Sequence, residues 1–321
     1  MEILKLMPAI NEAIWGGKRL VDEYGFKTDK KNSAEGWMLS CHKDGLCTVQ
    51  NGKYKGKTLK DAIETEGKEV LGTNNAQKKD FPILIKFIDA RDKLSIQVHP
   101  GDEYARRVEN ENGKTEAWLI LDAEKDAKLV YGVKNDVSKE EFSQRIRENT
   151  VEEVLNFVNV KRGDVVFIPS GMLHAIGAGI FLAEVQQSSN TTYRVYDYGR
   201  LDSNGNPREL HVEKACDVAC LKASKADFSP EGKTEKLPGG AKKTYLTGCE
   251  YFSMNDVEIN GEYKAAAGND SFVSLLILGG EGALSSGKQR FKVKKGDCFF
   301  VPAGAGDFIL KGKLSVLETK T

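Results

Sequence analysis

The stretch Gly163-Asp-Val-Val-Phe-Ile-Pro169-Ser-Gly171-Met-Leu-His174 joins a short apolar segment to a turn and then to a histidine. Branched and aromatic residues at 165–168 favour a β-strand, and the proline and glycine that follow favour a tight turn. The pattern of Gly, Asp, Phe, Pro and Gly recurs without gaps in Lys294–Asp307, with an offset of 133 residues. This repetition predicts two copies of one β unit. Because Asp307 stands where the first copy has His174, we expect a metal in the first copy only.

The composition favours a soluble globular protein rich in strands and turns. Hydrophobic residues make up 40% of the 321 residues, charged residues make up 29%, and there are 32 glycines. Lys and Arg together number 47, as do Asp and Glu, so no long-range field attracts nucleic acid or an anionic membrane. We expect neither as a partner.

The first residues lack the apolar core of a signal peptide, and no stretch approaches the length of a transmembrane helix. The six cysteines are scattered and form no CxxC motif, which predicts free, mostly buried thiols in a reducing cytoplasm. We expect a cytoplasmic protein that is a monomer or a weak homodimer.

Apolar and alternating segments predict strands along most of the chain. The clearest are Phe81–Asp89, Leu94–His99, Glu116–Leu121 and Phe181–Gln187. Helical periodicity or capping residues predict small helical insertions at about 58–71, 138–158 and 208–222. Cys216 and Cys220 both fall on the apolar face of the last helix, so we expect them to be packed. Residues 223–243 are polar and contain prolines and glycines, which predicts a linker.

Two histidines lie in settings that suit a metal site. Gln97 and His99 are two apart on a strand and therefore point to one side. Glu116 opens a later strand and can face the same point, as can His174 after its turn. Two imidazoles, a carboxylate and an amide oxygen suit a catalytic divalent metal, and neutral imidazole with oxygen ligands fits zinc. Manganese, iron and nickel remain open on spacing alone.

Charged residues accompany these candidate ligands. Lys114 lies two residues before Glu116, and Arg194 lies in a predicted strand after His174. An arginine beside a metal can stabilise an anion or alkoxide. Alternatively, Lys114 and Arg194 are surface charges that are solvated and have no catalytic role. His42 and His211 have no partner at ligand spacing, so a structural role is expected for both.

Several segments resemble those of the type I mannose-6-phosphate isomerases, in their short bacterial form. The similar segments are Phe81–Ala90, Leu94–Pro100, Gly113–Trp118, Pro169–Ala175 and Glu184–Asp197, with Ala34–Trp37 and Leu210–Ala215. The resemblance implies a mainly β fold of two cupin jelly-roll barrels in tandem. Residues 1–236 would form the catalytic domain, with the helical insertions, and residues 237–321 a second barrel without metal ligands.

The same resemblance implies a function and a set of site residues. One zinc ion per chain would be bound by Gln97, His99, Glu116 and His174. The positions implicated in catalysis would be Arg194, Lys114 and Glu184. The implied reaction interconverts mannose 6-phosphate and fructose 6-phosphate through a cis-enediol, and the partner is a sugar phosphate. Its phosphate is expected to meet Lys, Arg and hydroxyl groups at the barrel mouth, with Lys86 as one candidate.

Two other functions remain as alternatives. An iron or nickel dioxygenase of the cupin superfamily often uses three histidines and one glutamate, and Gln97 with Arg194 argues against it. A non-catalytic sugar-binding cupin would not need the intact ligand set or Lys114. Metal analysis with an oxygen-uptake assay distinguishes a dioxygenase from an isomerase. An isomerase assay distinguishes a non-catalytic sugar-binding cupin from an isomerase.

Overall fold

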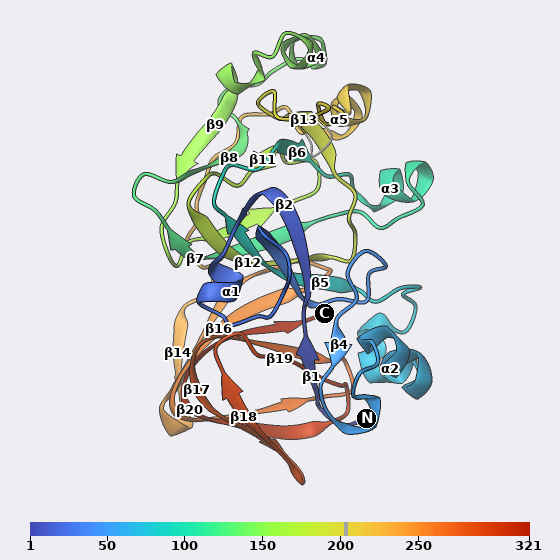
Figure 1. Ribbon diagram of the computed structural model, residues 1–321, viewed down its shortest axis with the longest axis vertical. Helices are drawn as coiled ribbons and strands as arrows, with labels where there is room; N and C mark the ends of the chain where they lie inside the picture. The colour runs from blue at the N-terminus through green and yellow to red at the C-terminus, as the bar shows by residue number, and fades with distance from the viewer. Residues whose placement is uncertain (202–204) are drawn as a thin grey trace.

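The computed structural model describes residues 1–201 and 205–321 as three β-sheets with five short α-helices (Figure 1). The mainly β fold agrees with the prediction. Within the described residues the strands pair as open sheets and not as closed hydrogen-bonded barrels. The helices are α1 (Arg19–Asp22), α2 (Leu59–Glu66), α3 (Asp102–Val108), α4 (Lys139–Arg147) and α5 (Val212–Val218).

Residues 9–196 supply two facing sheets. The six-stranded sheet has the order β10-β7-β12-β5-β2-β3, and the five-stranded sheet has the order β13-β6-β11-β8-β9. Strands of the six-stranded sheet are β2 (Ala9–Gly17), β3 (Ser33–Leu39), β5 (Ile83–Ala90), β7 (Glu116–Ala123), β10 (Val165–Ile168) and β12 (Ile180–Gln187). Strands of the five-stranded sheet are β6 (Ile96–Val98), β8 (Lys128–Val133), β9 (Leu155–Asn159), β11 (His174–Ala175) and β13 (Tyr193–Tyr196).

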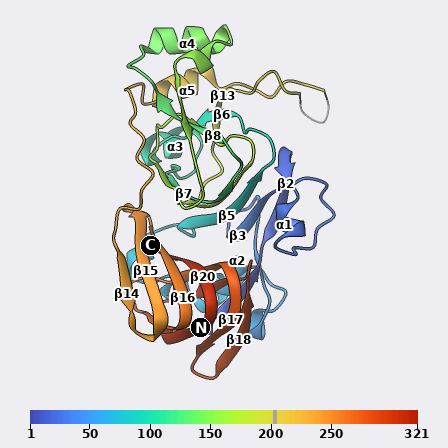
Figure 2. The same cartoon turned by 90° about the vertical axis from the view of Figure 1, so that its left-hand side faces the viewer.

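A nine-stranded sheet makes up the other end of the molecule (Figure 2). Its order is β14-β15-β16-β20-β17-β19-β1-β4, with β18 paired to β17. The strands are β1 (Leu4–Met7), β4 (Thr48–Val49), β14 (Thr234–Leu237), β15 (Ala241–Gly248), β16 (Ser253–Ala267), β17 (Val273–Ser286), β18 (Gln289–Lys294), β19 (Cys298–Val301) and β20 (Gly306–Lys320). This sheet therefore includes two strands from the N-terminal end of the chain. The division after residue 236 stays a prediction.

The six-stranded sheet is the middle layer of the molecule. Every residue of β5 and of β12 is buried. Phe87 and Phe181 pack with Phe300 of the nine-stranded sheet, whereas Ile88 packs with Leu129 of the five-stranded sheet. Because successive side chains of a strand point to opposite faces, these strands are buried on both sides, as the apolar density of Phe81–Asp89 predicted.

The two copies of the repeated unit have the same local structure. Gly163 and Gly296 both adopt a left-handed backbone, with φ of 90° and 87°. In both copies the next residue, Asp164 or Asp297, accepts a hydrogen bond from the backbone N–H three residues earlier, at 2.9 and 3.0 Å. The strand that follows is β10 in one copy and β19 in the other. The prediction of a duplicated β unit is confirmed, and its conserved Gly-Asp pair forms the turn before the strand.

The predicted helical insertions are only partly correct. Helix α2 begins at a capping box formed by Thr58 and Asp61, and it ends at Gly67, whose φ is 94°. In the second insertion α4 is present, but Leu155–Asn159 forms strand β9 and not a helix. Leu155, Phe157 and Val158 are branched or aromatic residues that fit a strand, and the segment pairs with β8. The Thr150 and Glu153 pattern predicts a capping box, but the Thr150 side chain caps nothing and only the 3-10 turn Val151–Glu153 follows it.

Two predictions for residues 208–243 are also wrong. Helix α5 ends at Val218 and Ala219 is extended, so Cys220 leaves the apolar face and is exposed. All six cysteines are free, as predicted, but only Cys47 and Cys298 are buried. The polar segment 223–243 is not simply a linker, since it contains strand β14 and a turn at Pro238–Gly240. The segment is polar because β14 is an edge strand whose charged residues face solvent. No helix in the described part of the chain is both long and apolar enough to cross a membrane.

Candidate metal centre and active site

The five-stranded sheet gathers the candidate residues on one face. Gln97, in β6, lies directly opposite His174 of β11 on one side and Arg194 of β13 on the other. Directly opposite residues of antiparallel strands point to the same face. The alternate residues Val98 and Tyr193 are buried in a separate apolar cluster on the other face. The sheet thus presents polar groups toward the middle layer and apolar groups away from it.

Three of the four predicted ligands converge closely. Nε2 of His99 lies 3.2 Å from Nε2 of His174. Glu116, the first residue of β7, has Oε2 at 3.5 Å from His99 Nε2 and Oε1 at 3.4 Å from His174 Nε2. All three side chains are at most 1% exposed. Within the described residues this is the one cluster of at least three His, Cys, Asp or Glu side chains suited to a metal.

The protonation of the two histidines favours metal binding. The carbonyl oxygen of Met172 can only accept, so Nδ1 of His174 donates to it at 2.8 Å, and Nε2 of His174 carries a lone pair. Burial lowers the pKa of His174 to about 4 and holds the pKa of His99 well below its usual value. Both imidazoles are therefore neutral at neutral pH, which is the form that binds metals.

Lys114 lies among these groups. Its buried ammonium is 2.6 Å from Glu116 Oε2 and 3.0 Å from His99 Nε2. An ammonium group only donates, so His99 Nε2 is an acceptor, as is His174 Nε2. The two Nε2 lone pairs are 3.2 Å apart and lie beside the carboxylate of Glu116. Oε1 of that carboxylate accepts no hydrogen bond from the described residues. Together these groups attract a cation. The donor set therefore fits a divalent metal.

Glu184 occupies the neighbouring strand of the middle layer. Nε1 of Trp118 donates to its Oε1 at 3.0 Å, and Nζ of Lys86 lies 3.3 Å from its Oε2. Burial alone would raise the pKa of Glu184, but the charges of Lys86 and then Lys114 outweigh burial and lower it. Burial and the nearby charge of Glu184 raise the pKa of Glu116 to about 7, so a cation beside Glu116 would favour its ionised form.

Lys86 is buried and not placed at an open mouth of the fold. Its ammonium lies near the carboxylates of Glu184 and Glu35, at 3.3 and 3.8 Å, and 4.9 Å above the ring of Trp37. Its charge is balanced by these carboxylates, which does not favour its predicted contact with the substrate phosphate.

Arg194 is held by groups that the sequence pattern did not reveal. Its Nη1 donates to the carbonyl oxygen of Glu209 at 2.9 Å, and its backbone N–H donates to Nδ1 of His211 at 3.1 Å. His211 therefore has a specific structural role beside a candidate catalytic residue. Only its occurrence in a short segment resembling the family could have singled it out.

A buried His–Glu–His cluster between two facing β-sheets defines a metal-binding protein of the cupin class. The model of the phosphomannose isomerase type I catalytic domain matches residues 3–116, and that of the mannose-6-phosphate isomerase cupin domain matches residues 241–320. Mannose-6-phosphate isomerase ManA of Bacillus subtilis is 40% identical over 315 residues, which cover 97% of this chain and 96% of the relative. The mannose-6-phosphate isomerase of Streptococcus mutans is 36% identical over 318 residues, covering 99% and 98%.

Solved structures agree with these relatives. The crystal structure of the mannose 6-phosphate isomerase from Bacillus subtilis matches with a TM-score of 0.91 and 38% identity, covering 99% of both chains. A zinc-bound mannose 6-phosphate isomerase has a TM-score of 0.78 at 17% identity, a likeness that concerns the fold. The chain belongs to the type I phosphomannose isomerase family.

Proposed function

We propose that the protein is a zinc-dependent aldose–ketose isomerase that interconverts mannose 6-phosphate and fructose 6-phosphate through a cis-enediol. The observation that carries this proposal is the convergence of two neutral imidazoles and a carboxylate on one buried point, beside Lys114, in a chain of this family. The family relatives named above are isomerases of mannose 6-phosphate.

The metal would be held by His99, His174 and Glu116, with the amide oxygen of Gln97 as the fourth ligand. Support for Gln97 comes from its register, since it faces His174 across the β6–β11 pair. When bound, zinc supplies a Lewis acid for an oxygen of the open-chain sugar. Imidazole, carboxylate and amide ligands without thiolate suit a catalytic zinc site.

Lys114 is the proposed proton shuttle. Its ammonium already lies within contact of two ligands, so it is close to where the reacting carbons would lie. It would carry the proton from C2 of the aldose to C1, while a proton moves from O2 to O1. The sugar therefore gains and loses no atoms. Glu184, fixed by Trp118 and Lys86, would supply a constant negative charge beside Lys114.

Arg194 is the proposed partner of the developing enediolate oxygen. It lies on the same sheet face as Gln97 and His174, and a fixed guanidinium stabilises charge that builds up on oxygen in the transition state. Arg200 and Arg208, which both pair with Asp197 close to Arg194, are candidates to meet the phosphate. Bidentate arginine contacts suit phosphate recognition.

The remaining features of the proposal concern organisation. We infer a catalytic unit of residues 1–236 and a second unit of residues 237–321 that carries no metal. The described residues of the second unit contain no cluster of three metal-binding side chains, and Asp307 is exposed. Six free cysteines support a reducing cytoplasm. We also propose that the protein is a monomer or a weak homodimer. Light scattering during size-exclusion chromatography tests this by measuring the molar mass.

A coupled assay that follows fructose 6-phosphate formation from mannose 6-phosphate tests the proposal. Activity should disappear after exhaustive chelation and return with stoichiometric zinc. Activity that survives chelation, or that is absent from the zinc-loaded protein, contradicts it. An oxygen electrode run in parallel should record no uptake, because a dioxygenase would consume oxygen.

A further inference from the structure

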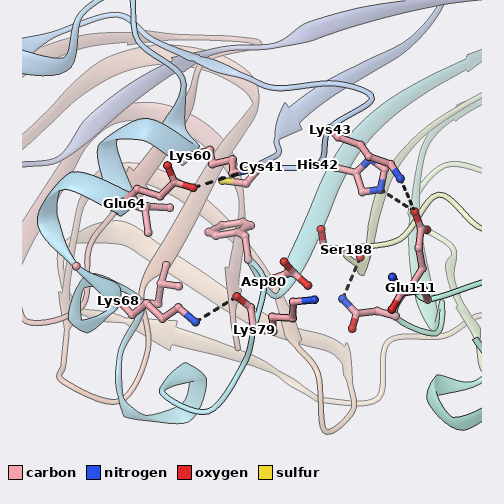
Figure 3. Close-up of a pocket in the computed structure, with 16 residues that line it drawn as sticks. Cys41, His42, Lys43, Lys60, Glu64, Lys68, Lys79, Asp80, Glu111 and Ser188 are labelled. Carbon is pink, nitrogen blue, oxygen red and sulfur yellow. Dashed lines mark hydrogen bonds and ion pairs between the residues drawn. The ribbon is translucent and has the colours of Figure 1, made fainter. Parts of the chain in front are cut away.

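A cavity of about 630 Å³ lies between α2, the segment before β5 and the loop after α3 (Figure 3). Its volume falls within the range of small-molecule sites. Four lysines line it, against three carboxylates. None of the proposed metal ligands lines it, nor does Arg194 or Lys114. The cavity is therefore distinct from the metal centre and has no part in the isomerase mechanism described above.

Aromatic side chains separate this cavity from the metal centre. His42 lines the cavity and is buried, and its ring packs edge-on against Trp37 at 5.7 Å between centroids. Trp37 also contacts the ammonium of Lys86, which belongs to the Glu184 network. A molecule in the cavity would thus lie two side chains away from the buried charges of the active site.

The cations of the cavity are unequally paired. Lys60 pairs with Glu64 and Lys43 pairs with Glu111, at 3.9 and 3.3 Å. No ion pair is formed by Lys79 within the described residues, and its ammonium extends into the space between the two sides of the cavity (Figure 3). The ammonium of Lys68 donates to the carbonyl oxygens of Lys78 and Lys79, at 2.8 and 3.1 Å. These two bonds fix the ammonium of Lys68 beside the backbone of residues 78 and 79. Ammonium groups without a carboxylate partner attract a dianion such as phosphate.

The rest of the lining suits a body that carries hydroxyl groups. Phe81 and Leu71 provide apolar lining, on which the C–H face of a polyol can pack. On the side opposite Lys68 lies Glu111, whose carboxylate accepts hydrogen bonds (Figure 3). The next residue, Asn112, also lines the cavity, and its amide can donate and accept. The cavity therefore combines a cationic side, an apolar lining and a neutral-to-acidic polar side.

We propose that this cavity is a second binding site for a small phosphorylated polyol, with the phosphate at Lys68 and Lys79 and the hydroxyl groups toward Glu111 and Asn112. Binding at this site needs neither zinc nor turnover, so it stands apart from the isomerase proposal.

Glu111 links the site to the active-site segments. Its Oε1 lies 3.3 Å from Lys43 Nζ and 3.7 Å from His42 Nε2. Its Oε2 accepts from Oγ1 of Thr191 at 3.1 Å, three residues before Arg194. Glu111 is also three residues before Lys114. An occupant that draws Glu111 toward its hydroxyl groups would shift both segments, and we therefore expect it to change kcat. This consequence rests on the isomerase function proposed above.

Calorimetric titration of the zinc-loaded full chain with glycerol 3-phosphate tests binding, because this probe has no carbonyl and is not an aldose or ketose. Glycerol serves as the uncharged control. The charge reversal Lys79→Glu should weaken binding at least tenfold. Lys55→Glu, an exposed lysine outside the cavity, and Arg194→Ala should each leave the affinity within twofold. The milder Lys79→Gln should give an intermediate loss, and its unfolding midpoint checks that the fold is intact.

Three results would overturn the site. The first is no binding by the wild type up to about 20 mM, a concentration that would detect even millimolar affinity. The second is an equal loss of affinity in Lys79→Glu and Lys55→Glu, and the third is loss of binding in Arg194→Ala, which would place the anion at the metal centre. For the coupling, glycerol 3-phosphate should change the kcat of the wild type and not that of Lys79→Glu. Purely competitive inhibition that is equal in both proteins would contradict it. If the chain lacked isomerase activity, the titration would still report on the site.

Discussion

His211 and Arg194 are joined by two hydrogen bonds: the backbone N–H of Arg194 donates to Nδ1 of His211 at 3.1 Å, and the backbone N–H of His211 donates to the carbonyl oxygen of Arg194 at 2.8 Å. The imidazole thus fixes the strand position from which the guanidinium extends. A small displacement of a group that stabilises the transition state costs a large share of its effect.

We expect His211→Ala to lower kcat about tenfold, equivalent to ~1.4 kcal/mol of activation free energy. The zinc content should not change, because the described contacts of the His211 ring are with Arg194 and Tyr193 and not with a proposed ligand. His211→Asn, whose side-chain oxygen can accept the same hydrogen bond, should recover most of the loss. If the asparagine variant is as slow as the alanine variant, His211 does not act by positioning Arg194.

Arg194 itself should matter for turnover and not for metal binding. Removal of one preorganised group that stabilises a developing oxyanion typically costs about 100-fold or more in kcat, and we expect that loss for Arg194→Ala. Arg194→Lys keeps the positive charge but not the planar guanidinium, so its kcat should lie between those of the wild type and Arg194→Ala. Steady-state kinetics and metal analysis of the same preparations provide the measurement. Parallel loss of zinc and turnover would mean that Arg194 has a structural role.

The two copies of the repeated turn offer a matched pair of stability tests. Gly163 and Gly296 both have a positive φ, which costs an L residue about 1–2 kcal/mol. A Cβ on Gly163 would meet no atom within 4 Å, whereas a Cβ on Gly296 would lie 3.2 Å from Tyr24 and 3.3 Å from Phe26. Both Ala variants should lower the free energy of unfolding, and Gly296→Ala should lower it more. Urea denaturation measures both, and an equal or reversed order would show that the aromatic rings move aside freely.

Asp256, in β16, should make the protein less stable as the pH rises from about 4 to 6. Burial, followed by the charge of Glu258, raises the pKa of Asp256 to about 6 in the folded chain, against about 3.9 in the unfolded chain. Between these values the folded state binds more protons, so the free energy of unfolding falls as the pH increases, and it stays lowered above pH 6.

Asp256→Asn should therefore stabilise the protein at pH 7 by about 1–3 kcal/mol and have little effect at pH 4. Urea unfolding at the two pH values measures the difference. Asp29→Asn, at an exposed loop position, is the control and should show no such pH-dependent gain. A gain at pH 4 that equals the gain at pH 7 would exclude the titration of Asp256 as its cause.

Sequence reasoning predicted the metal cluster because the ligands lie at fixed positions on short strands. Gln97 lies in β6 and His99 is two residues farther on, directly after that strand, and the turn before His174 has its own signature of Pro and Gly. The duplicated unit was likewise predictable, since Gly163 and Asp164 are required by the geometry of the turn itself. In both cases local backbone geometry limits which residues can stand at a position.

The parts that sequence reasoning missed depend on long-range contacts. Leu155–Asn159 has apolar residues at spacings that fit either a helix or a strand, and its pairing with β8 selects the strand. The bond between Trp118 and Glu184 joins residues 66 apart, and the role of His211 depends on its pairing with a backbone group of another element. Spacing along the chain does not specify such contacts.

X-ray absorption at the zinc edge, together with metal analysis of the purified chain, tests the central claim most directly. We predict one zinc per chain, with only nitrogen and oxygen neighbours at about 2.0–2.2 Å and the outer scattering of two imidazoles. His174→Ala should remove one imidazole from the spectrum or release the metal. A chain without stoichiometric metal, or a spectrum with sulfur at about 2.3 Å, would contradict a centre built from His99, His174 and Glu116.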